Sequence, residues 1–253
     1  MNKKTVINKL HGITLGVLLA CSSMATAEEA AVQQFLVDDN KIECPGAQFS
    51  SIQAAIDAAG AGSEIKICAG TYNEQVKISK SVKLIGEAGA VIMPTDMKVN
   101  AENIAMYEDM AAAISVKGAA NVSIEGLTID GSKNGISNCS AELVGIVCED
   151  MSGKIQGITI RNMDGATSSA ESCQAAYGIF AQSSDSGETD VKVQASTIDG
   201  CRSGAIVGNN LGTVLRAEGN TISSISKAAD TNGLKLEFGA IGTSKGNSIA
   251  AIQ

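Results

Sequence analysis

Residues 122–131, "VSIEGLTIDG", decide the fold of this chain of 253 residues. Apolar and polar residues alternate until a Thr-Ile pair is followed by a turn, a pattern typical of short β-strands. The pattern returns in "IQGITIRN" at 155–162, "VKVQASTIDG" at 191–200 and "VLRAEGNTIS" at 214–223. Because the intervals between these units vary while their core motif does not, we expect short strands joined by loops of different length.

A second series of short apolar segments accompanies the Thr-Ile units. Its members lie near Ile114 and at Gly145, Gly178, Gly204 and Gly239. No helical pattern long enough for a βαβ crossover separates the strands after Ile56. We therefore predict an all-β, single-domain parallel β-helix of roughly seven coils, spaced ~4.8 Å apart, with inward-facing Ile and Val as its core.

One helix is predicted, in "SSIQAAIDAAG" at 50–60. Its apolar face consists of Ile52, Ala55, Ile56 and Ala59. Ser50 with Gln53 resembles a capping box, and Gly60 is a natural helix stop. A stack of parallel strands ends in unpaired backbone groups and an exposed core. We expect this helix to cover that end of the first coil.

The stretch "SIQAAIDAAGAGSEIKICAGTYNEQVKISKSVKLIGEAG" at 51–89, with the later "TIDG" units, resembles right-handed parallel β-helix proteins of the pectin-lyase-like superfamily. The resemblance implies a right-handed β-helix over residues 45–253, behind a lead segment at 28–44. It does not imply one activity, because the superfamily includes lyases, esterases, hydrolases, epimerases and proteins with no known reaction.

The first 27 residues are typical of a secretory signal peptide. Their basic start contains Lys3, Lys4 and Lys9. An apolar stretch at 13–20 and a small-x-small cleavage site at 25–27 follow, so the mature chain is expected to be secreted or periplasmic. "LLAC", ending at Cys21, resembles a lipoprotein box, and cleavage there would give a lipid-anchored envelope protein. No later apolar run is long enough for a transmembrane segment.

Removal of the signal leaves 27 acidic residues against 16 of the 19 basic ones, and it removes His11, the single histidine. This acidic balance argues against nucleic acid or an anionic membrane as partner. A mature chain without histidine has no Ser-His-Asp triad, no histidine base and no histidine metal ligand.

Six cysteines remain, an even number that predicts disulfides in an exported protein. They are Cys44, Cys68, Cys139, Cys148, Cys173 and Cys201. Cys139 and Cys173 occupy nearly equivalent places on neighbouring coils, whose spacing suits a disulfide. We predict Cys139–Cys173, with Cys139–Cys148 as the competitor, and a Cys44–Cys68 bond that ties the lead segment to the first coil. The pairing of Cys148 and Cys201 stays open.

The motifs expected of several enzymes in this superfamily are absent from the sequence. There is no Asn-Thr-Asp run or Gly-His-Gly for a polygalacturonase-like site, no Asp-Pro-His-Glu for an epimerase-like site and no Asp-Phe pair for an esterase-like site. A lyase-like site, which needs aspartates for calcium and a basic residue, is compatible with Asp130, Arg161 and Asp199. These residues each follow a Thr-Ile pair and should stack on adjacent coils. The alternative is a structural charge ladder.

The expected function is therefore that of an exported, polysaccharide-interacting β-helix protein without a recognisable catalytic motif. A calcium-dependent polysaccharide lyase and a structural or adhesive envelope solenoid are the alternatives. The chain ends in "GNSIAAIQ", still in strand pattern. An uncovered strand edge favours self-association, so we expect either a dimer through the C-terminal edge or a last coil blunted by its loops.

Overall fold

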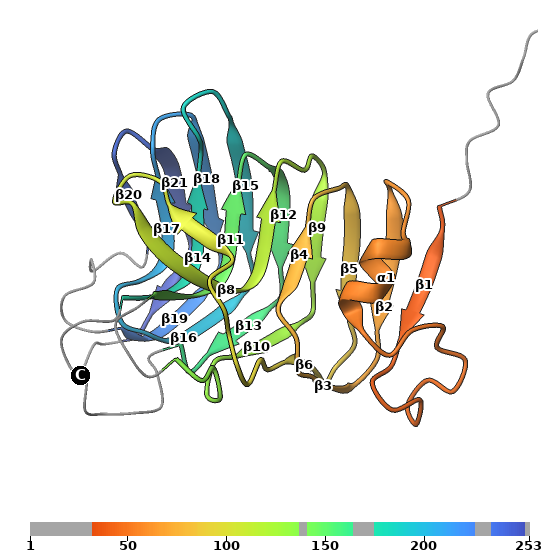
Figure 1. The fold of residues 1–253 in the computed structure, drawn as a ribbon. Helices are drawn as coiled ribbons and strands as arrows, with labels where there is room; N and C mark the ends of the chain where they lie inside the picture. Colours follow the sequence, from red (N-terminus) through yellow and green to blue (C-terminus); the bar gives the residue numbers. More distant parts are fainter. Residues whose placement is uncertain (1–31, 137–140, 164–174, 226–233, 251–253) are drawn as a thin grey trace, which may run out of the picture. The chain divides into compact units, whose positions relative to one another are not determined.

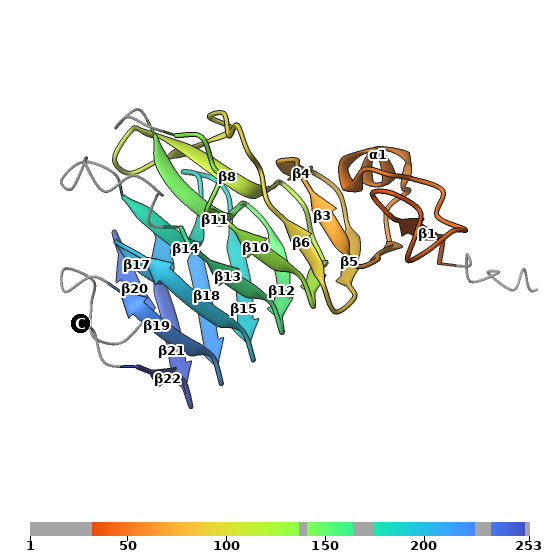
Figure 2. The same ribbon diagram turned by 90° about the horizontal axis from the view of Figure 1, so that it is seen from below.

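The computed structural model describes residues 32–136, 141–163, 175–225 and 234–250, which form one short helix and three sheets (Figures 1 and 2). The chain visits the sheets in turn, so successive strands of each sheet come from successive coils. Within each sheet the successive strands pair in parallel, which confirms the predicted right-handed parallel β-helix.

Sheet A contains, in spatial order, β1 (Gln34–Val37), β2 (Ser63–Ile67), β5 (Val82–Gly86), β9 (Val122–Glu125), β12 (Ser152–Gln156), β15 (Thr189–Gln194), β18 (Thr213–Glu218) and β21 (Ile241–Lys245). Sheet B contains β3 (Gly70–Tyr72), β6 (Ala90–Ile92), β10 (Thr128–Asp130), β13 (Thr159–Arg161), β16 (Thr197–Cys201), β19 (Thr221–Ile225) and β22 (Ser248–Ile249). Sheet C contains β4 (Val76–Ile78), β8 (Glu108–Lys117), β11 (Glu142–Glu149), β14 (Ala176–Gln182), β17 (Gly204–Asn209) and β20 (Leu234–Glu237). A short strand, β7 (Ala101–Asn103), pairs antiparallel with β8.

The Thr-Ile repeat lies in sheet B and builds the core. The isoleucines stack in register on β10, β13, β16 and β19, and each is at most 1% exposed: Ile129, Ile160, Ile198 and Ile222. The preceding threonines align beside them on the same strands. Because each unit presents its isoleucine at the same place, the repeat produces a continuous apolar column through the stack.

The corner between sheets A and B is made by one residue with positive φ. Gly157 adopts φ 59° between β12 and β13, and Ala195 adopts φ 48° at the equivalent place in the next coil. Left-handed backbone is accessible to glycine and disfavoured for alanine. The stacked neighbours therefore hold Ala195 in a conformation that its own preference opposes.

The predicted helix is present as α1 (Ile52–Ala58), and its expected apolar face is buried. The predicted capping box of Ser50 and Gln53 is wrong. The N-cap is Ser51, whose Oγ accepts a hydrogen bond from the Ala54 N–H at 3.2 Å. The carboxylate that completes the cap comes from Glu74, which accepts the N–H groups of Ile52 and Gln53.

Gln53 is instead used to pair with a sheet edge. Its Oε1 accepts the N–H of Lys77 on β4 at 2.6 Å, and its Nε2 donates to the Lys77 carbonyl at 3.2 Å. β4 is the outermost strand of sheet C and would otherwise present these groups unpaired. The helix thus covers the first coil, as expected (Figure 1). The Gln53 side chain takes the place of a neighbouring strand there.

Strand β1 lies inside the predicted lead segment 28–44 and pairs with β2, so part of that segment belongs to sheet A. The predicted signal peptide, residues 1–27, lies outside the described residues. In the described part of the chain, none of the helices has the length and apolar character to cross a membrane.

Candidate functional site

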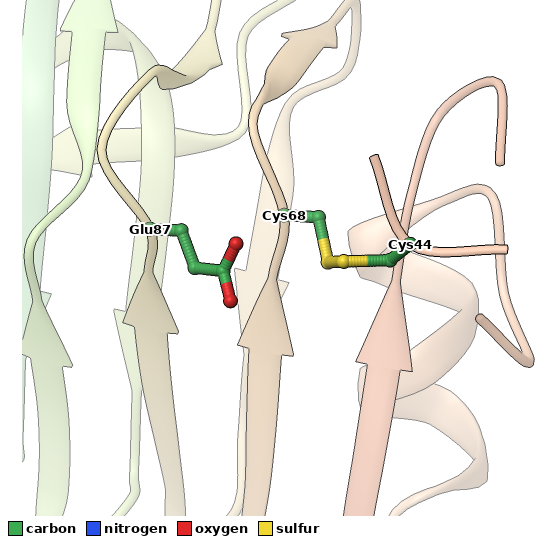
Figure 3. A group of neighbouring side chains, drawn as sticks. All are labelled: Cys44, Cys68 and Glu87. Atoms are coloured by element: carbon green, nitrogen blue, oxygen red, sulfur yellow. A yellow bond between two sulfur atoms is a disulfide. The ribbon is translucent and has the colours of Figure 1, made fainter. Parts of the chain in front are cut away.

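The Cys44–Cys68 disulfide is present, with 6.3 Å between the two Cα atoms (Figure 3). It ties the loop after β1 to the residue that follows β2, where the lead segment meets the first coil. Glu87 lies beside the two sulfurs, and the three side chains resemble a metal-binding group by distance alone. Because the sulfurs are bonded to each other, they are not thiolates and do not supply metal ligands.

The other predicted bond, Cys139–Cys173, falls on residues outside the described part of the chain. Cys148, on β11, is a fully buried free thiol, and burial raises the pKa of this thiol to about 12. The competing Cys139–Cys148 bond is therefore not formed. Cys201, on β16, is also buried.

An acidic group precedes the disulfide. Asp38, Asp39 and Glu43 place carboxylate oxygens within 4.8 Å of one another. Asp38 is fully buried and its carboxylate accepts the N–H groups of Asn40 and Cys44. These bonds order the loop that brings Cys44 to its partner.

The structure brings together two of the three predicted site residues. Asp130 and Arg161 face each other in register on β10 and β13, and Arg161 Nε lies 2.8 Å from Asp130 Oδ2. Asn162 and the backbone N–H of Ser132 donate to the other oxygen of Asp130. Burial alone would raise the pKa of Asp130, but the hydrogen bonds from Asn162, Ser132 and Arg161 outweigh it and lower the pKa to about 2.

Asp199 has a different partner, because its carboxylate accepts a hydrogen bond from Ser223 Oγ at 2.8 Å. Within the described residues, neither Asp130 nor Asp199 belongs to a group of three or more side chains at metal-ligand distance. The oxygens of Asp130 are occupied by three donors. This arrangement has the character of a structural ladder.

A second region lies on the outer face of sheet C, where sequence reasoning placed no site. Side chains that point away from the core form a separate apolar cluster there: Met110, Ala112, Val144, Val147, Tyr177, Phe180 and Val207. A hairpin made of β7, the turn 104–107 and the start of β8 lies over this face, in yellow in Figure 1.

Buried polar side chains of sheet C hold the hairpin down. Gln182, fully buried on β14, donates from Nε2 to the Glu102 carbonyl at 2.6 Å and accepts the Ile104 N–H at 3.1 Å. Asn209, on β17, donates to the Asn103 side chain at 3.1 Å. Its own Oδ1 is buried without a hydrogen-bond partner among the described residues. The hairpin is thus fixed by specific polar contacts in addition to apolar packing.

Glu142 lies beneath the hairpin at the start of β11. The residue is 7% exposed, and its carboxyl contacts Asn103 Nδ2 at 3.3 Å and the Tyr177 hydroxyl at 3.4 Å. Burial, and then the neighbouring Glu108 carboxylate, raise the pKa of Glu142 to about 7. Two carboxyl groups this close cannot both be ionised at low cost, so the pair retains a proton near neutral pH.

Tyr107 is the exposed part of this region. Its side chain is 84% exposed, and its backbone has φ 56°, which is uncommon for a bulky residue. The Tyr107 N–H donates to the Asn103 carbonyl, which closes the turn. Such strain persists where surrounding contacts impose it and is frequent at binding sites. We call Asn103, Tyr107, Glu108, Glu142 and Tyr177 the hairpin site.

The hairpin site combines an exposed ring, an exposed carboxylate and a buried carboxyl whose pKa is raised to about 7. These groups can pack against one face of a ligand ring and exchange hydrogen bonds with its hydroxyl groups. The sequence contains one signal for it, the Glu at the start of the apolar run "ELVGIVCE" of β11. Nothing in that run shows that a hairpin from residues 101–110 covers it.

Comparison with known proteins finds solved structures that are similar to this chain. A protein from Parabacteroides merdae ATCC 43184, described as a glycosyl hydrolase, matches with 16% identity and a TM-score of 0.53 over 84% of this chain and 98% of that chain. Pectin methylesterase from Yersinia enterocolitica matches with 14% identity and a TM-score of 0.46, over 78% of this chain and 66% of that chain. No family model and no curated protein matches the chain.

At these identities the likeness concerns the fold. The three sheets, in which the strands of successive coils pair in parallel, agree with it. The chain therefore folds as a right-handed parallel β-helix.

Proposed function

We propose that this protein is exported and binds polysaccharide through the hairpin site. The observation that carries the proposal is the exposed Tyr107 ring, held at positive φ directly before the Glu108 carboxylate. Glu108 in turn neighbours the buried Glu142. An aromatic ring beside carboxyl groups suits a sugar, which has an apolar ring face and hydroxyl groups at its edge.

Two further observations support the proposal. The Cys44–Cys68 disulfide is typical of an oxidising compartment outside the cytosol, in agreement with a signal peptide at 1–27. The Parabacteroides protein that shares the fold is described as a glycosyl hydrolase. The roles follow from exposure: Tyr107 packs on the sugar, Glu108 accepts from its hydroxyls, and Glu142 sets the protonation of the pair.

A glycan array of neutral and acidic polysaccharides, followed by titration calorimetry with the best ligand, tests this function. Replacement Tyr107→Ala should weaken binding by about tenfold, the effect of losing roughly 1.4 kcal/mol of contact. Phe238→Ala is the matched control, because Phe238 is also an exposed aromatic residue with positive φ, 57% exposed at φ 50°, in the turn after β20. That variant should bind as the unmodified chain does.

The proposal fails if no polysaccharide on the array binds, or if both aromatic variants lose affinity equally. A reaction is detected in parallel by incubating the protein with uronic-acid polymers and following the ultraviolet absorbance of unsaturated ends. Turnover that chelator abolishes would replace the binding function by a calcium-dependent lyase.

A further inference from the structure

The hairpin at 101–110 carries negative charge that nothing within it offsets. Its charged residues are Glu102, Glu108 and Asp109, and none of its residues is basic. Glu102 and Asp109 oppose each other directly where β7 pairs with β8. Like charges in this arrangement are destabilising. The position of the hairpin therefore depends on its contacts with sheet C beneath it.

Side-chain hydrogen bonds fasten the hairpin to sheet C, and one of the residues that form them is incompletely satisfied. Gln182 bonds to the Glu102 carbonyl and the Ile104 N–H. Asn209 donates to the Asn103 side chain. Asn209 is 1% exposed, and its Oδ1 has no hydrogen-bond partner among the described residues. A buried acceptor without a donor is costly, and water would hydrate this oxygen once the hairpin lifts.

The apolar side chains under the hairpin form a cluster that is separate from the core of the coils. Met110 and Val144 belong to it, and Ala101 of β7 packs against it. Because segments with few contacts to the main core can open locally, the hairpin can lift while the coils stay folded. Lifting exposes the rings of Tyr177 and Phe180, which meet edge to face with their centroids 5.1 Å apart.

Glu142, on β11, is the group beneath the hairpin that responds to pH. The titratable groups around it come from three other strands: Glu108 of β8, Tyr177 of β14 and, beyond Tyr177, Glu237 of β20. Glu237 is paired with Lys235 at 2.8 Å. Burial, and then the surrounding carboxylates, raise the pKa of Tyr177, so its hydroxyl stays protonated. An ionised Glu142 therefore faces a second carboxylate, that of Glu108, across the contact between sheet and hairpin.

We propose that the hairpin is a pH-controlled lid, which lies closed on sheet C while Glu142 and Glu108 share a proton and lifts from the sheet when both are ionised. The sign follows from proton binding. The pKa of Glu142 is about 7 in the closed state against an ordinary value of 4.5, so the closed state binds the proton more tightly. A rise in pH through about 7 then favours the open state.

Opening is a property of the chain without ligand. Its consequence for binding rests on the proposed function. Tyr107 and Glu108 lie on the hairpin, and they move away from Glu142 when it lifts. The hairpin site is then complete only at or below neutral pH, and ligand binding there weakens as the lid opens.

Hydrogen exchange of the full chain, followed residue by residue by NMR between about pH 5.5 and about pH 8.5, tests the lid without any ligand. The reporter is the Ile104 N–H, which bonds to Gln182 across the contact between hairpin and sheet. The internal reference is the Thr197 N–H, which bonds to the Ile158 carbonyl between two coils. Protection factors are compared, because they correct for the intrinsic dependence of exchange on pH.

Two variants and one control separate the shared proton from other effects of pH. Glu142→Gln keeps the size and hydrogen-bonding capacity of the side chain and removes its charge. Glu108→Gln, at an exposed position, removes the opposing charge. Asp109→Asn is the control, because it removes the same charge from the next residue of β8, which opposes Glu102 and points to the other face of the strand.

The protection factor of Ile104 in the unmodified chain should fall at least tenfold across this range, while that of Thr197 changes less than twofold. Both Glu142→Gln and Glu108→Gln should keep Ile104 protected at the upper pH, and Asp109→Asn should reproduce the unmodified profile. If Glu142→Gln fails to fold, Glu108→Gln decides.

Three outcomes overturn the lid. They are constant protection of Ile104 in the unmodified chain, equal losses at Ile104 and Thr197, and a control that behaves as the two variants do. Because the measurement uses no ligand, a chain that binds no polysaccharide can still show the lid. A hairpin that stays closed leaves the Tyr107→Ala binding result standing, so the two failures are distinguishable.

Discussion

Arg161 Nε lies 2.8 Å from Asp130 Oδ2, and the two residues face each other in register across β10 and β13. The Asp130 side chain is 9% exposed and the Arg161 side chain 47%. A pair with one exposed partner is screened by solvent and adds little to stability. The Asp130 carboxylate also keeps its bonds from Asn162 and Ser132 without the arginine.

Replacement Arg161→Ala should therefore lower the free energy of unfolding by ~1 kcal/mol or less. Calcium should not raise the melting temperature of either protein, because a ligand stabilises a fold only by binding it. Differential scanning fluorimetry with calcium and with chelator measures both effects. Lys98→Ala, at an ion pair exposed on both sides, is the control and should change stability even less. A chelator-sensitive melting curve would restore the calcium site at Asp130 and Asp199.

Glu142 makes stability depend on pH in an unusual direction for a carboxyl group. Its folded-state pKa, about 7, lies above the ordinary value of 4.5, so the folded state binds the proton more tightly than the unfolded state. The resulting stabilisation is complete below about pH 4.5 and is lost as pH rises through about 7. Between these limits the free energy of unfolding of the unmodified chain should fall by ~1 kcal/mol or more relative to that of Glu142→Gln, which has no titrating group at this position.

Urea unfolding at several pH values measures this difference. Glu108→Gln is the informative second variant, because removal of the like charge should lower the pKa of Glu142 and flatten the profile. Parallel pH profiles for the unmodified chain and Glu142→Gln would show that the two carboxyl groups do not share a proton.

The Cys44–Cys68 bond closes a loop across a sequence separation of 24 residues. Replacement of both cysteines with serine should cost roughly 3 kcal/mol, since the bond restricts the unfolded chain. Denaturant unfolding with and without reductant measures the loss, and the double variant should respond less to reductant than the unmodified chain does. Non-reducing peptide mapping that links Cys44 to any other cysteine would contradict the assignment.

Glu74 completes the N-cap of α1 from a distant part of the chain. Replacement Glu74→Ala leaves the N–H groups of Ile52 and Gln53 without this acceptor and should cost roughly 1–2 kcal/mol. Glu87→Ala, at an exposed glutamate in the next coil, is the control and should be nearly neutral. Thermal melts compare the two. Equal melting temperatures would show that Ser51 alone suffices as the cap.

The last described strands, β20, β21 and β22, each pair with one neighbour in the part of the chain that the structure describes. Ile241, on β21, is 63% exposed. We expect concentration-dependent association through this edge, and Ile241→Lys should weaken it because a charge on an edge opposes strand pairing. Analytical ultracentrifugation measures both proteins. A monomer at every concentration, with the Ile249 amide protected from hydrogen exchange, would favour a blunted last coil.

Sequence reasoning predicted the features that depend on local period and on repetition. The Thr-Ile units predicted the buried column from Ile129 to Ile222 because equivalent residues of stacked coils must take equivalent places. The apolar face of α1 followed from helical spacing alone. The stacking of Asp130 on Arg161 followed in the same way, from one position counted past each repeat.

The tertiary structure alone decided the sites that join distant segments. Gln182 bonds to Ile104 and Glu102 of the hairpin, which lie 78 and 80 positions earlier in the chain. Asn209 bonds to Asn103 across a sequence separation of 106 residues. Contacts at such separations depend on where a loop folds back, which no local pattern encodes. The cap from Glu74 was missed for the same reason: a capping box of Ser50 and Gln53 was predicted, whereas Ser51 and Glu74 form the cap. The repeated coil could therefore be predicted from the sequence, because period-2 burial and stacking are local and cumulative. The tertiary structure decided where carboxyl groups, amides and rings meet on its surface, because those meetings require the complete path of the chain.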